Sequence, residues 1–298
     1  MHENQAIVYL NKNTKCLIRL FLSAHSLRES GYTGSVVLFL QGAQAPFVQK
    51  IVDICEMTKV TVPDDTRNPL VQKASLWRYA PMRLNVYIDL DTIVLKNPEI
   101  LFDSIRNKGF ATTQFTNWHS NGNRIGNRIR QWKHLPQNML DAAVSFGPAV
   151  NTGLFAFDKA CTMLPEWEKM VREGEKRNMA GRLIDEIGCQ IMVANTKAPV
   201  VILDETWNRS VTYGLSTDPA IVHYHGGKHL LNSQKICDVW KDYYWKMREK
   251  YPKLQDELRN FNQYDRQRNL GAYLERNRKR DRRLCRGREV SVQVPAPL

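Results

Sequence analysis

Short apolar runs alternate along this chain with longer segments whose apolar residues recur every three or four positions. Such runs, rich in β-branched and aromatic residues, are typical of buried strands, and the periodic segments are typical of helices. The sequence predicts strands at 6–10, 36–40, 59–62, 85–88, 110–115, 150–157 and 200–203. Between them it predicts helices at 17–27, 46–55, 73–80, 167–170 and 187–193. Alternating strands and helices predict an α/β fold with a mostly parallel, Rossmann-like sheet flanked by helices.

The predicted strand at 85–88 ends in Asp89-Leu90-Asp91. Side chains two residues apart on an extended chain point to the same side, so both carboxylates should face one point. In open α/β sheets, ligands bind outside the carboxyl ends of the strands. Two adjacent carboxylates repel each other unless a cation lies near them, and oxygen ligands suit Mg²⁺ or Mn²⁺. The pattern therefore predicts a divalent-cation site, although Asp-x-Asp also occurs in surface turns.

Length and composition are those of an ordinary folded protein. With 298 residues, 43% of them apolar, the chain can form one large domain or two small ones. No apolar run approaches the ~20 residues that span a bilayer. Residues 1–5 lack the basic and apolar regions of a signal peptide. The cysteines occur singly, at Cys16, Cys55, Cys161, Cys189, Cys237 and Cys285. We therefore expect reduced thiols and a cytoplasmic location.

The formal net charge of +13 is unevenly distributed. Residues 276–288 contain eight Lys and Arg residues against one acid, Asp281, so this segment alone supplies +7. Such a tail can bind nucleic acid or anionic lipid, or be a solvated segment without a core. Anionic lipid attracts basic residues with about 1 kcal/mol each near the surface. We expect a peripheral contact of this tail with anionic membrane.

Five short motifs follow one another between residues 6 and 230. They are Ile88 to Pro98 around the two aspartates, Asn151-Thr152-Gly153, Asp185-Glu186, Trp207-Asn208 and His223-Tyr224-His225-Gly226. Their residues and order resemble the nucleotide-sugar glycosyltransferases with the GT-A fold, in particular family 8, the glycogenin and bacterial galactosyltransferase group. The resemblance implies a GT-A domain at 1–235, which leaves 236–298 as a helical, basic extension.

The resemblance implies a metal-dependent transfer of a sugar from a nucleoside-diphosphate sugar, such as a UDP-hexose, with retention of anomeric configuration. The acceptor would be a hydroxyl of a glycan, glycolipid or protein. Mn²⁺ or Mg²⁺ would be held by Asp89, Asp91 and His223, with His225 as the reserve ligand. The residues expected at the nucleotide sugar are Leu10, Asn11, Lys73, Asp89, Leu90, Asn151, Thr152, Gly153, Asp185, Gly226 and Lys228. The expected catalytic residues are Asp185, Glu186 and Asn151.

Each assignment has a purely structural alternative. Lys73 could be a solvated lysine at the edge of the core, and Asn151 could form a turn. His223 could be an ordinary histidine at a strand end, and Asp185 could be a carboxylate stabilised by the dipole of the helix that it begins.

The chain also departs from the family pattern. Glu186 stands where the family often has glutamine. Lys228 comes one residue before the position of the family's lysine, which His229 occupies. If the reaction inverts configuration, Asp185 or Glu186 would serve as the general base. The sequence leaves this choice open.

Two other functions remain as alternatives. A sugar-phosphate nucleotidyltransferase shares the fold but usually has a glycine-rich, basic loop after the first strand, which Asn11-Lys12-Asn13 matches poorly. A nucleic-acid-binding protein is suggested by the net charge, yet most of the excess lies in one terminal segment. The first strand is not followed by Gly-x-Gly-x-x-Gly, which argues against a dinucleotide site.

Overall fold

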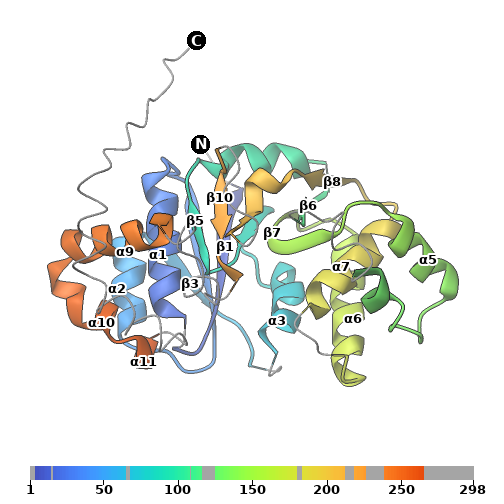
Figure 1. The fold of residues 1–298 in the computed structure, drawn as a ribbon, viewed down its shortest axis with the longest axis horizontal. Helices are drawn as coiled ribbons and strands as arrows, with labels where there is room; N and C mark the ends of the chain where they lie inside the picture. Colours follow the sequence, from blue (N-terminus) through green and yellow to red (C-terminus); the bar gives the residue numbers. More distant parts are fainter. Residues whose placement is uncertain are drawn as a thin grey trace, which may run out of the picture.

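The computed structural model describes residues 4–14, 16–64, 68–107, 109–115, 125–179, 183–211, 218–225 and 238–264. Within them, seven strands form one central sheet in the order β3-β2-β1-β4-β7-β6-β8 (Figure 1). These strands are β1 Gln5–Lys12, β2 Ser35–Gln41, β3 Met57–Thr61, β4 Leu84–Ile88, β6 Phe110–Gln114, β7 Val150–Asp158 and β8 Val200–Leu203. Each strand predicted from the sequence is present, with ends that differ by up to two residues.

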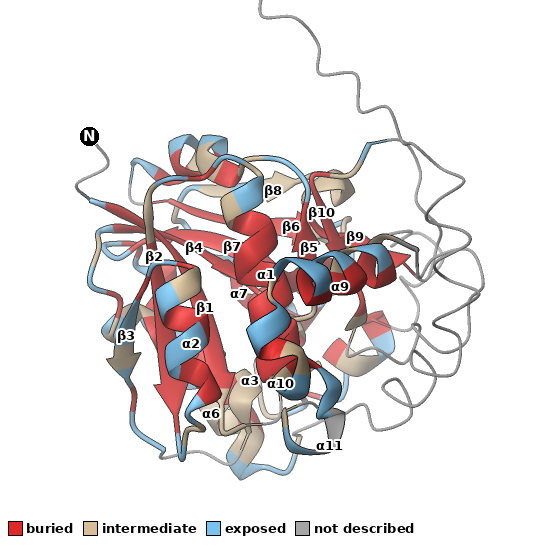
Figure 2. Ribbon diagram, turned by 90° about the vertical axis from the view of Figure 1, so that its left-hand side faces the viewer, coloured by how far each residue is buried: buried red, intermediate tan, exposed pale blue. Residues whose placement is uncertain are grey.

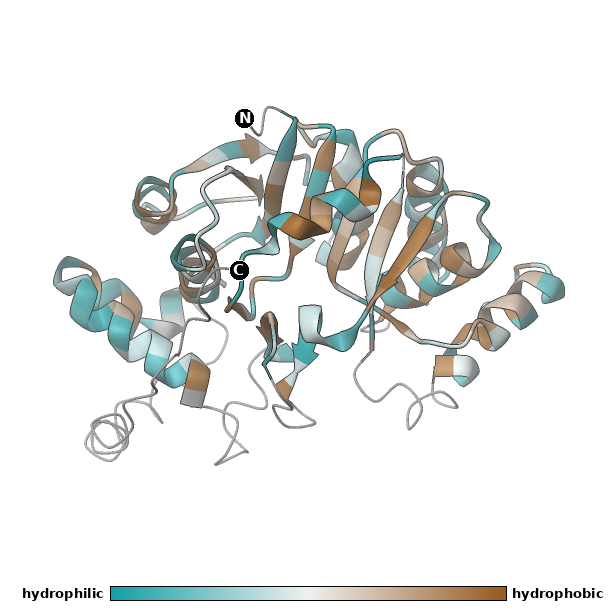
Figure 3. Ribbon diagram, turned by 90° about the horizontal axis from the view of Figure 1, so that it is seen from above, coloured by the Kyte–Doolittle hydropathy of each residue, from teal (hydrophilic) through white to brown (hydrophobic). Residues whose placement is uncertain are grey.

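The sheet is mostly parallel, as predicted. β1 pairs in parallel with β2 and β4, β2 with β3, and β6 with β8. β7 is antiparallel to both of its neighbours, β4 and β6. Figure 2 shows that the strands are largely buried, and Figure 3 shows hydrophobic residues concentrated along them. β7 is buried along its whole length, as expected of a strand with covered faces.

A second, three-stranded sheet was not foreseen from the sequence. It consists of β5 Thr92–Val94, β10 Ile221–His223 and β9 Arg209–Ser210, with β10 in the centre. β10 runs antiparallel to β5, and the backbone N–H of Tyr224 donates to the carbonyl of Asp91 over 2.8 Å. This pairing brings His223, distant in sequence, to the end of β4.

Helices cover both faces of the central sheet (Figure 1). One face carries α1 Leu17–Glu29, α2 Phe47–Ile54, α9 Asp238–Lys250 and α10 Gln255–Arg259, with α11 Phe261–Tyr264 beside them. The other carries α3 Pro69–Ser75, α5 Gln137–Ser145, α6 Met163–Lys176 and α7 Ile184–Asn195. Short 3₁₀ helices are η1 Leu76–Arg78, η2 Pro98–Ile105, η3 Glu205–Asn208 and η6 Pro252–Leu254. Each face has its own hydrophobic core.

The helix predicted at 73–80 begins earlier and ends earlier than expected. The side-chain oxygen of Asn68 accepts a hydrogen bond from Leu70 N over 3.0 Å, and Pro69 occupies the first helical position. Both features are favourable at a helix start. The α-helix ends at Ser75 and the chain continues as η1. This local arrangement directs Lys73 toward the end of β4.

The C-terminal helices share a core with the first helix. Trp240, Tyr244 and Met247 of α9 and Leu258 of α10 belong to the same hydrophobic cluster as Phe21 of α1. The domain boundary expected after residue 235 stays a prediction, and the basic segment 276–288 lies outside the described residues. None of the helices described here combines the length and apolar character needed to cross a membrane.

Candidate active site

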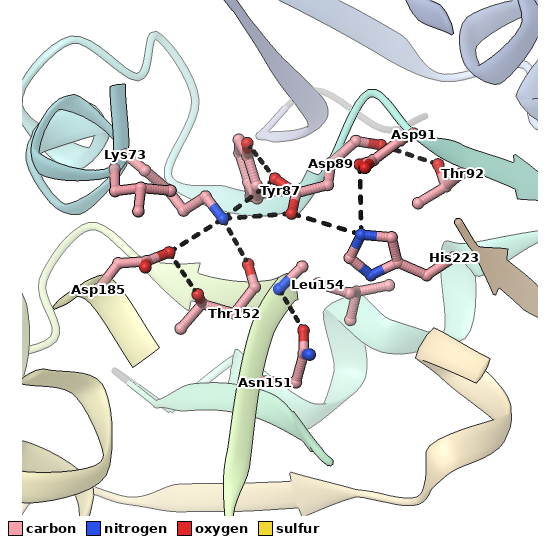
Figure 4. A network of polar contacts seen from close by, with 12 residues as sticks. Lys73, Tyr87, Asp89, Asp91, Thr92, Asn151, Thr152, Leu154, Asp185 and His223 are labelled. Atoms are coloured by element: carbon pink, nitrogen blue, oxygen red, sulfur yellow. Dashed lines mark hydrogen bonds and ion pairs between the residues drawn. The ribbon is translucent and has the colours of Figure 1, made fainter. Parts of the chain in front are cut away.

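Asp89, Asp91 and His223 come together just beyond the carboxyl end of β4 (Figure 4). One potential ligand atom from each lies within 4.8 Å of the others. His223 Nε2 is 3.2 Å from Asp91 Oδ1 and 3.8 Å from Asp89 Oδ2. The aspartates follow β4 directly, whereas His223 arrives through the pairing of β10 with β5. The structure therefore brings together the three residues predicted as metal ligands.

The surroundings of His223 fit a metal-binding imidazole. Asn208 Nδ2 donates to Asn151 Oδ1 over 2.7 Å and to Thr113 Oγ1 over 3.1 Å. Because the amide nitrogen is directed to these two acceptors, Asn208 Oδ1 is directed to His223 Nδ1, 2.9 Å away. Nδ1 then carries the proton and Nε2 is the atom available to a cation. Metal-binding histidines usually have such a second partner, which fixes the ring and its tautomer. Two carboxylates and one imidazole suit Mn²⁺ or Mg²⁺.

The charges within the cluster affect one another. Burial alone would raise the pKa of Asp91, but His223 and Arg19 outweigh it and hold the pKa well below its usual range. Burial disfavours the charged form of His223, yet the two aspartates raise its pKa. The pKa of Asp89 is raised by burial and by Asp91, against the opposing charge of Lys73. These directions show that the two aspartates and His223 share protons and charge, and a divalent cation bound between them would replace the proton on His223 Nε2.

Lys73 connects Asp89 to α7. Its Nζ lies 3.0 Å from Asp89 Oδ1 and 3.1 Å from Asp185 Oδ2, and it donates to the carbonyl of Thr152 over 3.2 Å. The side chain is only 4% exposed. Burial would lower the pKa of Lys73, but Asp89 and Asp185 raise it above its usual value. Lys73 is therefore a buried, charged member of the site and not a solvated lysine.

Asp185 and Glu186 lie in the first turn of α7, where the helix dipole favours acids. Asp185 Oδ2 also accepts a hydrogen bond from Thr152 Oγ1 over 2.7 Å, so this oxygen is shared by two donors. Glu186 differs: its Oε2 is buried and has no hydrogen-bond partner in the part of the chain that the structure describes. Burial and the charge of Asp185 raise the pKa of Glu186 well above its usual range.

Asn151 and Gly153 support the histidine from β7. Asn151 Oδ1 accepts from Gly153 N over 2.7 Å as well as from Asn208. A Cβ atom on Gly153 would lie 2.5 Å from His223 Cε1, closer than real Cβ atoms approach. The Asn-Thr-Gly motif therefore leaves room for the imidazole. Contact of Asn151 with a sugar stays a prediction.

The other predicted residues lie at varying distances from this cluster. His225 stacks on His223, with ring centroids 4.1 Å apart, and it is not part of the three-residue ligand group. Asn11 is buried at the end of β1, where its Nδ2 donates to the carbonyl of Asn13 over 2.6 Å. Leu10 is buried in the core on the α3 side of the sheet, and Leu90 is half-buried. Gly226, Lys228 and His229 lie outside the described residues.

Sequence reasoning missed two contributors. Tyr87 donates from its hydroxyl to Asp89 Oδ1 over 2.6 Å, and Lys73 Nζ lies 5.1 Å from the centre of its ring. The period-two argument that paired Asp89 with Asp91 extends back to Tyr87 and could have found it. Asn208 was recognised as part of a motif but was given no role, because only the fold brings it to His223.

Comparison with known proteins supports the same architecture. No protein-family model matches the sequence, and no curated protein matches it. Among solved structures, the galactosyltransferase LgtC with donor and acceptor sugar analogues is similar over 74% of this chain and 87% of its own, at 14% identity and a TM-score of 0.52. The bifunctional glycosyltransferase WbbM is similar over 76% of this chain, at 12% identity and a TM-score of 0.53, but this chain spans only 46% of its length.

These likenesses concern the fold. At such low identity they establish a shared architecture, and the central sheet with its flanking helices is the GT-A fold of glycosyltransferases. An active-site mutant of LgtC is similar too, with a TM-score of 0.50 at 14% identity over 74% of this chain and 87% of its own. Membership of family 8 stays an expectation from the sequence motifs.

Proposed function

We propose that this protein is a glycosyltransferase that moves a hexose from a UDP-sugar to a hydroxyl of a glycan, glycolipid or protein. The observation that carries the proposal is the cluster of Asp89, Asp91 and His223 at the carboxyl end of β4 in a GT-A fold. This edge of an α/β sheet is where ligands bind. A Mn²⁺ or Mg²⁺ ion held there supplies Lewis-acid stabilisation of the charge on the leaving diphosphate.

The protein groups around the cluster position the donor. Lys73 neutralises Asp89 and Asp185 together and holds α7 against the end of β4. Asp185 then faces the donor sugar, in the role that the motif resemblance implies. Asn151, on the strand β7 next to β4, shares that role. Oε2 of Glu186 is buried and has no partner among the described residues, so it is suited to bind a sugar hydroxyl.

We infer that the transfer retains the anomeric configuration. Inversion needs a carboxylate base, and neither acid is well suited to that task. Asp185 Oδ2 already accepts from Lys73 and Thr152, and Oε2 of Glu186 is buried with no donor among the described residues to stabilise its charged form. In a retaining reaction, the bond between the anomeric carbon and the diphosphate breaks. The acceptor's proton passes to the leaving phosphate oxygen while the acceptor oxygen bonds to the anomeric carbon.

The test is a donor screen by calorimetry with UDP-, GDP- and dTDP-sugars, each with and without Mn²⁺. We expect tight binding of UDP-sugars only with the ion. Asp91→Ala should abolish this metal-dependent binding, whereas Asp103→Ala should not, because Asp103 is exposed and pairs with Arg106. Equal affinity in native protein and Asp91→Ala would refute the metal assignment. His223→Ala should weaken binding less, since two carboxylates remain.

The cytoplasmic location and the membrane contact of the basic tail are also proposals. The first is supported by the single, scattered cysteines and the second by the charge of residues 276–288. Deletion of 276–298 should leave donor hydrolysis within a few-fold of the native rate and reduce co-sedimentation with anionic vesicles at low salt. Unchanged vesicle binding would contradict the membrane contact.

A further inference from the structure

Hydrogen bonds hold the backbone of the bend that carries the two aspartates. Asp89 N donates to the carbonyl of Gly153 over 2.8 Å, and the carbonyl of Asp91 accepts from Tyr224 N over 2.8 Å. The carbonyl of Asp89 accepts instead from a side chain, Thr92 Oγ1, over 2.8 Å (Figure 4). A threonine hydroxyl that bonds to the carbonyl three residues earlier stabilises such a local bend. The conformation of the bend therefore depends on the orientation of the Thr92 side chain.

Thr92 is in turn held by the first helix. Its Oγ1 lies 2.7 Å from Ser23 Oγ of α1, and Thr92 and Ser23 are both buried. A hydroxyl has one proton to donate, and the proton of Thr92 goes to the carbonyl of Asp89. Ser23 is therefore the donor in the contact between the two hydroxyls. A longer contact of 3.3 Å joins Ser23 Oγ to Tyr9 Oη of β1.

Ser26 of α1 holds the strand that follows the bend. Its Oγ accepts from Val94 N over 2.9 Å and donates to the carbonyl of Ser23 over 2.8 Å. Ser23 and Ser26 are three residues apart and so lie on the same face of the helix. Because β5 begins at Thr92 and ends at Val94, α1 contacts both ends of this short strand.

On the basis of the proposed function, we propose that Thr92 and Ser23 are positioning residues of the metal site. Neither belongs to the group of three ligands. They fix the backbone of the bend and thereby the directions of the Asp89 and Asp91 carboxylates. Residues that orient metal ligands commonly affect metal affinity strongly. A valine at position 92 would keep the shape of the side chain but leave the carbonyl of Asp89 without its donor and Ser23 without its closest acceptor.

Binding of Mn²⁺ alone to the full chain, measured by calorimetry and by electron paramagnetic resonance of the bound ion, tests this role. We expect Thr92→Val to bind Mn²⁺ about tenfold more weakly than the native protein and to change the spectrum, because the carboxylates are displaced. Ser23→Ala should lower the affinity several-fold. Thr92→Ser keeps the hydroxyl and should retain the native affinity and spectrum.

Ser30→Ala is the control on the same helix. Ser30 follows the last residue of α1, and its Oγ donates to the carbonyl of Leu27 over 2.7 Å, so the variant loses a comparable hydrogen bond without any change at β5. It should keep the native affinity. A native protein that binds Mn²⁺ but no UDP-sugar would contradict the proposed function alone, whereas one that binds no Mn²⁺ would overturn both proposals.

A purely structural role of Thr92 gives a different result. Urea unfolding of the metal-free variants would then show a loss of stability, while the folded Thr92→Val protein, checked by circular dichroism, would keep the native Mn²⁺ affinity and spectrum. That outcome would overturn the proposal. Equal losses of affinity in Thr92→Val and Thr92→Ser would overturn it too, because the hydroxyl would not be the group that matters.

Discussion

The side-chain oxygen of Asn208 lies 2.9 Å from Nδ1 of His223 and leaves Nε2 of the imidazole facing Asp91. Asn208 is itself fixed, because its Nδ2 donates to Asn151 and Thr113 on two neighbouring strands of the central sheet. The orientation of the proposed metal ligand thus depends on β6 and β7, which supply no ligand themselves.

Replacing Asn208 should therefore weaken metal binding although Asn208 does not touch the ion. In Asn208→Ala the imidazole loses the partner that sets its tautomer and its ring orientation. We expect the affinity for Mn²⁺, measured by calorimetry with UDP present, to fall by about 10- to 100-fold.

Asn138→Ala is the control for this change, because Asn138 is an exposed asparagine of α5. It should leave the Mn²⁺ affinity at the native value. If Asn208→Ala also binds Mn²⁺ as the native protein does, the asparagine does not orient the ligand.

Lys73 should be required for stability as well as for donor binding. Lys73→Met removes the buried charge but leaves Asp89 and Asp185, which then lose the cation between them. Removal of one partner from a buried ion pair typically costs about 3 to 5 kcal/mol. Urea unfolding of the metal-free protein should show a loss of this order.

An exposed ion pair provides the comparison. Lys96 pairs with Asp218 over 2.6 Å, but their side chains are 48% and 80% exposed. Because such pairs contribute roughly 0 to 1 kcal/mol, Lys96→Met should change the free energy of unfolding little. Similar losses in the two variants would contradict the importance of Lys73.

Gly153 should tolerate no side chain. In Gly153→Ala the new Cβ would lie 2.5 Å from His223 Cε1 and 2.9 Å from Asn151 Oδ1, so the imidazole must move. Overpacking of this kind costs about 1 to 3 kcal/mol. We expect a lower melting temperature together with reduced Mn²⁺ affinity.

Gly126→Ala tests whether these effects are specific. The nearest atom to a Cβ at Gly126 is 3.5 Å away, which is an ordinary contact. This variant should keep the native Mn²⁺ affinity and melting temperature. If Gly153→Ala also keeps the native Mn²⁺ affinity and melting temperature, the imidazole of His223 is not confined by Gly153.

The strands and the aspartate pair could be predicted because their signals are local. β4 is a run of five buried residues, and the side chains of Asp89 and Asp91 follow from the period of two in an extended chain. The alternation of strands and helices was enough to indicate the parallel sheet. The motif order added His223 and Lys73 to the candidate site.

The contacts that complete the site could not be derived in this way, because they join residues far apart in the chain. His223 reaches Asp91 only through the three-stranded sheet, whose strands are two or three residues long. Such short strands leave no recognisable hydrophobic pattern. Lys73 and Asp185 are separated by more than a hundred residues, and their ion pair depends on how α3 and α7 pack.

A buried histidine between the first helix and the C-terminal helices was likewise not foreseen. His25 of α1 has Nδ1 2.7 Å from Tyr243 Oη and Nε2 2.9 Å from Tyr251 Oη. The residues that face this ring also include Glu29, with an oxygen 3.8 Å from Nδ1, and Lys250, with Nζ 3.2 Å from Nε2. These contacts fasten α9 to α1.

The pKa values in this cluster make the attachment sensitive to acid. Burial lowers the pKa of His25 from 6.5 to about 4, against the opposing charge of Glu29, while Lys250 and Lys246 lower it further. Burial would raise the pKa of Glu29, but hydrogen bonds from Lys246 and Tyr243 bring it down to about 2. Between pH 4 and 6.5 the unfolded chain therefore binds a proton at His25 that the folded chain does not.

Stability should accordingly fall as the pH is lowered through this window, because the state that binds more protons is favoured by acid. The pKa shift of His25 is discounted for solvent screening. His25 should then lower the free energy of unfolding by an amount on the order of 1 kcal/mol between about pH 7 and pH 5. Urea unfolding at these two pH values would measure it, in the native protein and in His25→Gln, which cannot titrate. The range stays above the ordinary pKa of glutamate, about 4.3, so the loss due to Glu29 begins only at lower pH. The native protein should lose more stability than the variant; equal losses would mean that His25 takes up a proton without disturbing the contact between α1 and α9.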